Sequence, residues 1–367
     1  MVEESQAGRL WKIPVVKHSK FLKHPTKPFE VNENSTVADA LTAMSQTAFQ
    51  GKNLASAVDV WGAMLKGNVT IFFGLAGAMV PAGMRNIISY LIKNRLIDCL
   101  VSTGANLFHD IHETLGKYHY QGDANTDDVL LQKEGVDRMY DVFASEPEFR
   151  NLDSYITRFA DTIDLDRPYT TREFLFLLGQ HLSKQTETDG IVTSAFKAGV
   201  PIYCPALGDS SIGIGLAART KGKKVLFDII ADVQETALLS LKAKETGVIY
   251  LGGGTPKNFI QQMEVTAHLW SNKVVGHEYA IQVTADAPHW GGLSGCTFEE
   301  AKSWGKIKQN AKMVTVHCDS TIALPLITTA VAQKYKDIIK RRAYPDLFLT
   351  LKKTRIEDLK PQTSKSS

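Results

Sequence analysis

The chain has 367 residues, of which 44% are hydrophobic and 22% are charged, and its formal net charge is +3. This mixture is typical of a folded globular protein, and it excludes a disordered chain, which would be poorer in apolar residues. The small net charge gives no reason to expect nucleic-acid binding. The longest uncharged apolar stretch, residues 320–332, is shorter than the roughly 20 residues that cross a bilayer, so we expect no membrane span.

The N-terminal residues include acidic side chains and lack the apolar segment of a signal peptide. The four cysteines are widely spaced and form no CxxC motif, which favours reduced thiols over disulfides or a structural zinc site. We therefore expect a cytoplasmic protein that holds no metal.

Residues 1–68 are expected to form an N-terminal arm followed by a helical extension. Residues 10–34 hold three prolines and several lysines, which indicates an irregular arm. The pattern Thr36-x-x-Asp39 resembles a capping box and predicts the start of a first helix. A second helix is predicted by apolar residues on one face, with Gly67 as its end: Leu54, Val58, Trp61 and Leu65.

From residue 69 onward, short apolar runs alternate with helical patterns. The runs predict strands at 69–73, 97–101, 202–204, 225–229, 248–251, 280–283 and 313–316. This alternation predicts an α/β fold with a doubly wound, mostly parallel sheet. We assign residues 69–340 to one large domain with this fold and residues 341–367 to a C-terminal tail. The acid-rich residues 123–153 are expected to form a solvated excursion between sheet elements.

The segments that follow the predicted strands are rich in Gly, Ser, Thr and Asp, and ligands bind at such strand ends in open α/β sheets. Six of them together favour a large ligand such as a dinucleotide, although glycine at strand ends is common in any α/β protein. The GxGxxG and Walker patterns are absent, so a dinucleotide would bind in a less familiar way. The six segments are 74–83, 102–106, 205–215, 252–258, 284–295 and 318–321.

Lys306 follows Trp304-Gly305 at the end of a predicted helix. A lysine beside a tryptophan could be a buried amine with a lowered pKa, as imine formation requires. The alternative is a surface lysine at a helix end, where its positive charge suits the helix dipole, and composition alone favours this alternative.

His109 and His112 have helical spacing and could share a face as metal ligands, but no other His or Cys cluster completes a site. Two polar residues on a helix facing a cleft or solvent are the more economical interpretation. Asp286, His289 and Trp290 are more typical of a packed loop, and the absence of GxSxG leaves a serine hydrolase unsupported.

Several segments together resemble the deoxyhypusine synthase family. They include SWGKI at 303–307, VTVHCDSTIALPL at 314–326, and residues 81–111, 204–213 and 251–260, and the likeness runs in the same order over residues 35–340. The resemblance implies a Rossmann-like homotetramer with NAD bound near subunit interfaces. It also implies transfer of an aminobutyl group from spermidine to an acceptor amine through an imine on an active-site lysine.

The resemblance assigns the imine-forming lysine to Lys306 and substrate binding to Glu300 and Trp304. Asn258 stands at a substrate-binding position where the family has histidine. A tryptophan face and a carboxylate suit an ammonium ligand. The implied NAD-binding residues are Thr103, Gly104, Asp209, Gly253, Gly254, Asp319 and Ser320.

Four positions depart from the family pattern. Asn258 replaces its histidine, Leu293 and Ile214 replace aspartates, and His109 replaces a glutamate. The loss of carboxylates weakens the usual binding of the whole spermidine cation. We therefore expect a small amine acceptor, as in homospermidine formation. The alternatives are a true deoxyhypusine synthase that modifies a lysine of the hypusine-containing translation factor, or a non-catalytic NAD- and polyamine-binding relative.

Overall fold

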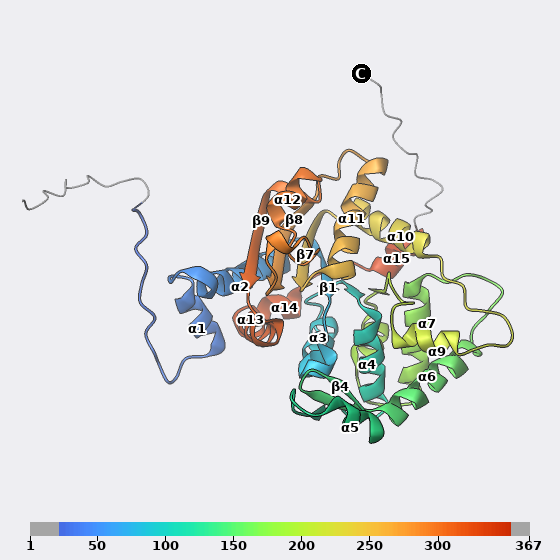
Figure 1. The fold of residues 1–367 in the computed structure, drawn as a ribbon. Coiled ribbons are helices and arrows are strands. Elements are labelled where there is room, and N and C mark those ends of the chain that lie inside the picture. The colour runs from blue at the N-terminus through green and yellow to red at the C-terminus, as the bar shows by residue number, and fades with distance from the viewer. Residues whose placement is uncertain (1–21, 354–367) are drawn as a thin grey trace, which may run out of the picture.

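The computed structural model describes residues 22–353, which form a mixed α/β fold around a six-stranded sheet (Figure 1). Every strand pair in this sheet is parallel, which confirms the predicted fold class. The predicted arm at 10–34 and the tail lie partly outside the described residues. The six strands are β1 (Val69–Leu75), β2 (Cys99–Ser102), β6 (Ile202–Tyr203), β7 (Glu245–Leu251), β8 (His277–Thr284) and β9 (Ile307–His317).

The strand order is β6-β2-β1-β7-β8-β9. The chain runs outward from β1 through β2 to β6, then returns to pair β7 with the other side of β1 and continues to β9. The order therefore reverses between β1 and β7, and dinucleotides bind in the crevice that such a reversal creates at the carboxyl ends of the strands.

Helices cover both faces of the sheet, and successive residues of β1 point to opposite faces. Ile71 and Phe73 belong to a large apolar core, whereas Phe72 belongs to a smaller one on the other face. The smaller core also holds residues of α10 (Ile229–Lys242), α11 (Gly254–Trp270), α12 (Phe298–Ser303) and α15 (Leu347–Lys353). Helices that contribute to the large core are α3 (Arg85–Lys93), α4 (Gly104–Thr114), α6 (Glu146–Ala160), α7 (Thr171–Ser183), α8 (Ile191–Ala198), α9 (Ser211–Ala217) and α13 (Ser320–Lys334).

The N-terminal extension packs onto the large core rather than standing apart. Helix α1 (Val37–Met44) begins with the predicted capping box, in which Thr36 and Asp39 exchange hydrogen bonds. Helix α2 (Phe49–Lys66) buries Trp61, whose Nε1 donates to the carbonyl of Leu96 at 3.2 Å. None of the helices within residues 22–353 combines the length and the apolar character needed to cross a membrane.

The predicted strand at 225–229 is wrong. Phe227 makes only an isolated bridge with Tyr169, and Ile229 already begins α10, whose N-cap is Asp228. The apolar residues here are largely exposed, since Leu226 is 57% and Ile230 is 63% accessible. A short apolar run does not distinguish a buried strand from the start of a helix.

The acid-rich excursion at 123–153 is mostly solvated, as expected, but it is regularly folded. It contains α5 (Asp128–Lys133), and β4 (Val136–Met139) and β5 (Val142–Ser145) form an antiparallel sheet with β3 (Tyr120–Gln121). The short η1 (Val80–Met84), η2 (Pro288–Trp290) and α14 (Lys336–Arg341) complete the described elements.

A buried ion pair connects the segment after α14 to the start of β2. The guanidinium of Arg342 donates to both oxygens of Asp98, at 3.0 and 2.6 Å, and also to the carbonyl of Val69 at 2.9 Å. Asp98 is fully buried and its carboxylate also accepts from the amide of Ile71. This segment, assigned to the tail by sequence, thus fixes the amino ends of β1 and β2.

Arg342→Met should lower the free energy of unfolding by about 3–5 kcal/mol, because it leaves the buried Asp98 carboxylate without its partner. Chemical denaturation measures the change. The control is Lys334→Met, which removes an exposed pair with Asp59 at 2.8 Å and should cost less than about 1 kcal/mol. Adding Asp98→Asn to the Arg342→Met variant should recover part of the lost free energy of unfolding, because it removes the unpaired buried charge. Equal effects of the two single variants would contradict the assignment.

Candidate active site

Lys306 lies in the turn between α12 and β9, and its backbone is held on both sides. Its amide donates to the carbonyl of Ala301 at 3.0 Å, and its carbonyl accepts from the amide of His277 at 3.1 Å. Gly305 adopts a left-handed backbone conformation with φ of 69°, which lets the chain turn sharply before the strand. Lys306 is half-buried, so part of the residue remains accessible to solvent.

The ring of Trp304 lies beside this amine, with the Nζ of Lys306 5.3 Å from the ring centroid. Trp304 is 70% exposed, so much of its ring faces solvent and is available to a cationic ligand. The structure therefore brings together the predicted lysine and the predicted tryptophan.

Glu300 lies in the first turn of α12, where it forms a capping box with Thr297. Its Oε2 accepts from the amide and the hydroxyl of Thr297, at 2.7 and 3.0 Å. These hydrogen bonds hold the pKa of Glu300 below its usual range, and the nearby Lys257 adds to the effect. Its Oε1 makes no hydrogen bond to any residue within 22–353. Glu300 thus presents an ionised carboxylate oxygen to an ammonium group.

Lys257 is a second lysine at this site that the sequence analysis missed. It is 1% exposed, and its Nζ donates to Oε1 of Gln282 at 3.0 Å and to the carbonyl of Cys296 at 2.5 Å. Burial lowers the pKa of Lys257 to about 8; Lys306 acts in the same direction and Glu300 opposes it. The available signal was a lysine in the first turn of a helix, where the dipole disfavours a cation.

Asn258 follows Lys257 on α11 and is half-buried beside the glycine turn at the end of β7. Gly253 lies so close to the next loop that a Cβ there would be 2.2 Å from the Cα of Ser294. A Cβ on Gly254, by contrast, would point into open space, and this residue has a φ of 54°. Gly253 is therefore covered by the loop after β8, and Gly254 leaves open space at the β1–β7 reversal, where a dinucleotide phosphate can approach closely.

Gln282, also missed from sequence, connects this turn to the loop after β8. Its Nε2 donates to the carbonyls of Gly252 at 2.9 Å and Ser294 at 2.7 Å, while its Oε1 accepts from Lys257. One amide thus holds the lysine, the glycine turn and the loop together. Leu293 in that loop is 46% exposed.

The residues predicted at the end of β2 form another part of the site. Thr103 is the N-cap of α4, and a Cβ on Gly104 would be 2.3 Å from Oγ of Ser210, the neighbour of the exposed Asp209. Asn106 was not singled out from sequence, yet its Nδ2 donates to the carbonyl of Gly77 at 2.8 Å and to Oγ1 of Thr103 at 3.0 Å. These contacts join the loops that follow β1 and β2.

Asp319 and Ser320 begin α13 at the carboxyl end of β9. Oδ1 of Asp319 accepts from the amide of Thr321 at 2.7 Å, and the hydrogen bonds from Thr321 lower the pKa of Asp319. Asp319 lines a cavity of about 640 Å³, together with the loop after β1, Glu113 and His119. An ionised carboxylate in such a cavity suits the ribose hydroxyls of a dinucleotide.

Lys306 and Asp319 do not meet within one chain. Lys306 precedes the first residue of β9 and Asp319 lies just beyond the last, and β9 has 11 residues. At about 3.3 Å per residue such a strand spans about 35 Å. The structure thus separates the lysine end of the predicted site from the Asp319 end.

The lowered pKa of Lys257 predicts a pH-dependent stability. Its pKa is about 8 in the folded protein and about 10.4 in an unfolded chain, so the unfolded state binds more protons between these values. The free energy of unfolding should therefore rise with pH across this window, by up to about 3 kcal/mol from this group.

Lys257→Met should remove this rise. The difference in free energy of unfolding between the wild type and the variant should therefore grow from about pH 8 to about pH 10. Denaturation at a series of pH values measures it. Lys308→Met, at an exposed position of β9, controls for the loss of one lysine. A difference that stays flat across the window would contradict a buried amine with this pKa.

Comparison with known proteins agrees with the residue pattern. A sequence model of the deoxyhypusine synthase family matches residues 39–331. "Probable deoxyhypusine synthase 2" of Methanosarcina acetivorans is 52% identical over 334 residues, covering 90% of this chain and 96% of the relative. "Probable deoxyhypusine synthase 1" of the same organism is 41% identical, covering 84% and 95%.

A crystal structure of a "putative deoxyhypusine synthase" from Entamoeba histolytica has the same fold, with a TM-score of 0.58. It is 18% identical and covers 83% of this chain and 96% of its own. The match over most of the chain and the high identity to curated relatives lead to one conclusion: this chain belongs to the deoxyhypusine synthase family of aminobutyltransferases.

Proposed function

We propose that this chain is a cytoplasmic, NAD-dependent transferase that moves an aminobutyl group from a polyamine donor to a small acceptor amine. The group is carried as an imine on Lys306. The observation that supports this most directly is that the amine of Lys306 lies 5.3 Å from the ring centroid of Trp304 in a chain of this family.

The surroundings of Lys306 suit imine chemistry. Imine formation requires the amine of Lys306 to attack the donor carbon in its neutral form. Glu300 and the face of Trp304 would bind the cationic nitrogen of the donor. Attack by Lys306 on the oxidised donor carbon releases diaminopropane, and attack by the acceptor amine then releases Lys306.

NAD would supply the hydride acceptor for oxidising the donor amine and the hydride donor for reducing the final imine. The glycine turn at Gly253 and Gly254 fits a pyrophosphate, because Gly254 faces open space at the strand reversal. The carboxylates of Asp319 and Asp209 suit ribose hydroxyls, and Thr103, Gly104 and Ser320 begin the helices next to them.

The separation of Lys306 from Asp319 supports an assembled site. A second copy of the chain would bring its Lys306 to the cofactor residues of the first, because β9 keeps them apart within one chain. We therefore propose a homo-oligomer, and specifically the homotetramer that the family resemblance implies.

The proposal of a small amine acceptor rests on the changed side chains. Leu293 and Ile214 are 46% and 52% exposed and uncharged where the family pattern has aspartates. This chain is 52% identical to "Probable deoxyhypusine synthase 2" of Methanosarcina acetivorans but 41% identical to "Probable deoxyhypusine synthase 1" of the same organism. This difference is in keeping with a separate branch of the family. The alternatives remain modification of a translation-factor lysine and a non-catalytic binding protein.

One experiment separates these three functions. Purified protein is incubated with NAD and labelled spermidine, with either putrescine or the hypusine-containing translation factor as acceptor. Labelled homospermidine supports the proposal, and label on the translation factor supports the true synthase. Absence of both products, together with no borohydride-trapped label on the enzyme, supports a binding protein.

Lys306→Arg should reduce transfer to below about 1% of the wild-type rate, because a guanidinium cannot form the imine. Product analysis measures transfer, and borohydride trapping should lose its label in parallel. NAD binding and the melting temperature should stay close to wild type. Lys302→Arg, on the adjacent helix, is the control. Retention of more than a few per cent of transfer by Lys306→Arg would rule out covalent catalysis by this lysine.

NAD should bind at least about tenfold more tightly than NADP, because a carboxylate at the ribose repels a 2′-phosphate. Fluorescence titration of both cofactors measures the ratio. Asp319→Asn keeps a good helix cap but removes the carboxylate charge. It should therefore reduce the ratio of the affinities for NAD and NADP. Equal affinity of the wild type for the two cofactors would argue against this placement.

A further inference from the structure

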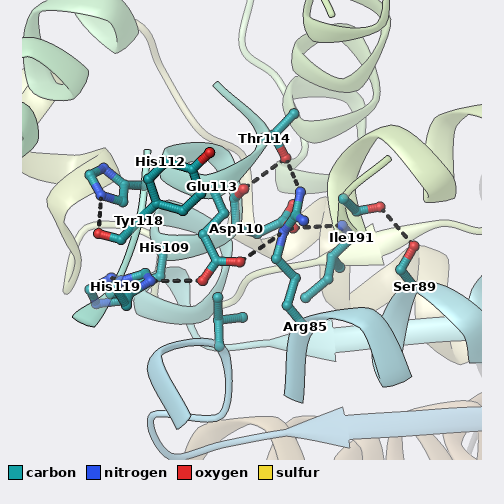
Figure 2. Close-up of polar contacts among 12 residues, drawn as sticks. Arg85, Ser89, His109, Asp110, His112, Glu113, Thr114, Tyr118, His119 and Ile191 are labelled. Atoms are coloured by element: carbon teal, nitrogen blue, oxygen red, sulfur yellow. Dashed lines mark hydrogen bonds and ion pairs between the residues drawn. The ribbon is translucent and has the colours of Figure 1, made fainter. Parts of the chain in front are cut away.

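A row of titratable side chains runs along α4 and the segment before β3, at a distance from Lys306. His109, His112 and Glu113 share one face of α4, and His119 reaches back to them from beyond its C-terminus (Figure 2). The rings of His109 and His119 lie 4.9 Å apart between centroids, and Phe149 packs against both.

Three of these residues form a continuous hydrogen-bonded chain. Nδ1 of His119 lies 2.7 Å from Oε1 of Glu113, and Nε2 of His119 lies 2.9 Å from Nδ1 of His109. A carboxylate only accepts, so Nδ1 of His119 donates to Glu113. In a neutral ring Nε2 of His119 then accepts, which makes Nδ1 of His109 the donor.

This order leaves Nε2 of His109 as an unprotonated nitrogen. It makes no hydrogen bond to any residue that the structure describes, and His109 is half-buried rather than sealed in the core. Burial, with the rings of His119 and His112 adding to it, lowers the pKa of His109 to about 3. His109 is therefore a neutral imidazole at neutral pH.

The Glu113 end of the chain is suited to hold a positive charge. A proton passed to His119 makes an imidazolium that rests against the Glu113 carboxylate, as in other histidine–carboxylate pairs. Oε2 of Glu113 lies 3.7 Å from Nε of Arg85, which is itself bound to Asp110 at 2.8 Å, as Figure 2 shows. Arg85 is already committed to Asp110, so Glu113 remains available to His119.

The other charged groups around the chain have partners of their own. Nε2 of His112 lies 3.8 Å from Glu148, and burial lowers the pKa of His112. Glu148 also pairs with Lys117 at 3.2 Å.

The chain lies on the cofactor side of the fold. Glu113 and His119 line the same cavity of about 640 Å³ as Asp319. His109 lies one helical turn after Asn106, which joins the loops that follow β1 and β2. Ligands of this fold class bind at these strand ends.

We propose that His109, His119 and Glu113 form a proton relay that accepts a proton from the ammonium group of the amine substrate. The proposal rests on the transferase function, in which the amine must lose this proton before a hydride can leave its carbon. The ammonium N–H breaks and its proton bonds to Nε2 of His109. The Nδ1 proton of His109 moves to Nε2 of His119, and the resulting imidazolium is held by Glu113.

Glu113→Gln tests the relay, with Glu148→Gln as the matched control, because both glutamates are 26% exposed and lie beside a histidine. Glu113→Gln should slow NADH formation from NAD and spermidine about 100-fold, as loss of general base catalysis does. Its pH profile should change as well, because the neutral amide no longer places a negative charge beside His119. Glu148→Gln should stay within about twofold of wild type in rate and profile.

Nitrogen NMR of isotope-labelled histidines gives a readout that does not depend on activity. The wild type should show His109 protonated on Nδ1 and bare on Nε2, with signals assigned through His109→Asn and His119→Asn. A proton on Nε2 of His109 overturns the relay, as does an unchanged rate and pH profile in Glu113→Gln. If wild type forms no NADH, the transferase proposal fails, and the spectra alone decide whether this chain of hydrogen bonds exists.

Discussion

The length of β9 is the constraint on which the site depends. Its backbone ladder with β8 runs from His277 to Thr284, and this pairing fixes Lys306 at one end of the strand and Asp319 at the other. Side chains of ordinary length cannot bridge a separation of about 35 Å. A single chain therefore keeps the two parts of the candidate site apart, and in the proposed homo-oligomer a second copy would join them.

Between these two parts, buried polar groups connect the strands. The amine of Lys257 is buried and has lost its hydration. Its two hydrogen bonds, to a side-chain amide and to a backbone carbonyl, compensate only in part for this loss. The same Gln282 amide holds the glycine turn at the β1–β7 reversal. Gln282, on β8 beside the edge strand β9, thus connects Lys257 to the glycine turn through one side chain.

Helix α4 makes the part of the candidate site around Asp319 rigid. Asp110, on the face next to His109, accepts from the backbone amides of Ile191 and Val192 at 2.7 and 2.9 Å and from Arg85. These bonds cap α8 and fix the rotation of α4, since a helix tied at a buried carboxylate cannot turn about its axis. His109 and Glu113 are held at a fixed spacing for that reason, and the hydrogen bonds to His119 keep their geometry.

The sequence by itself determined the parallel α/β architecture, the capping box at Thr36 and the grouping of Lys306 with Trp304, because these follow from local periodicity, caps and adjacent residues. It failed at 225–229, where a short apolar run fits a strand or a helix start equally well. Only the tertiary structure decided that Lys257 is buried beside Lys306, that His119 completes a chain with His109 and Glu113, and that Lys306 and Asp319 lie at opposite ends of β9. Burial, hydrogen-bond partners and separation across a sheet depend on contacts between distant segments, and no local pattern encodes them.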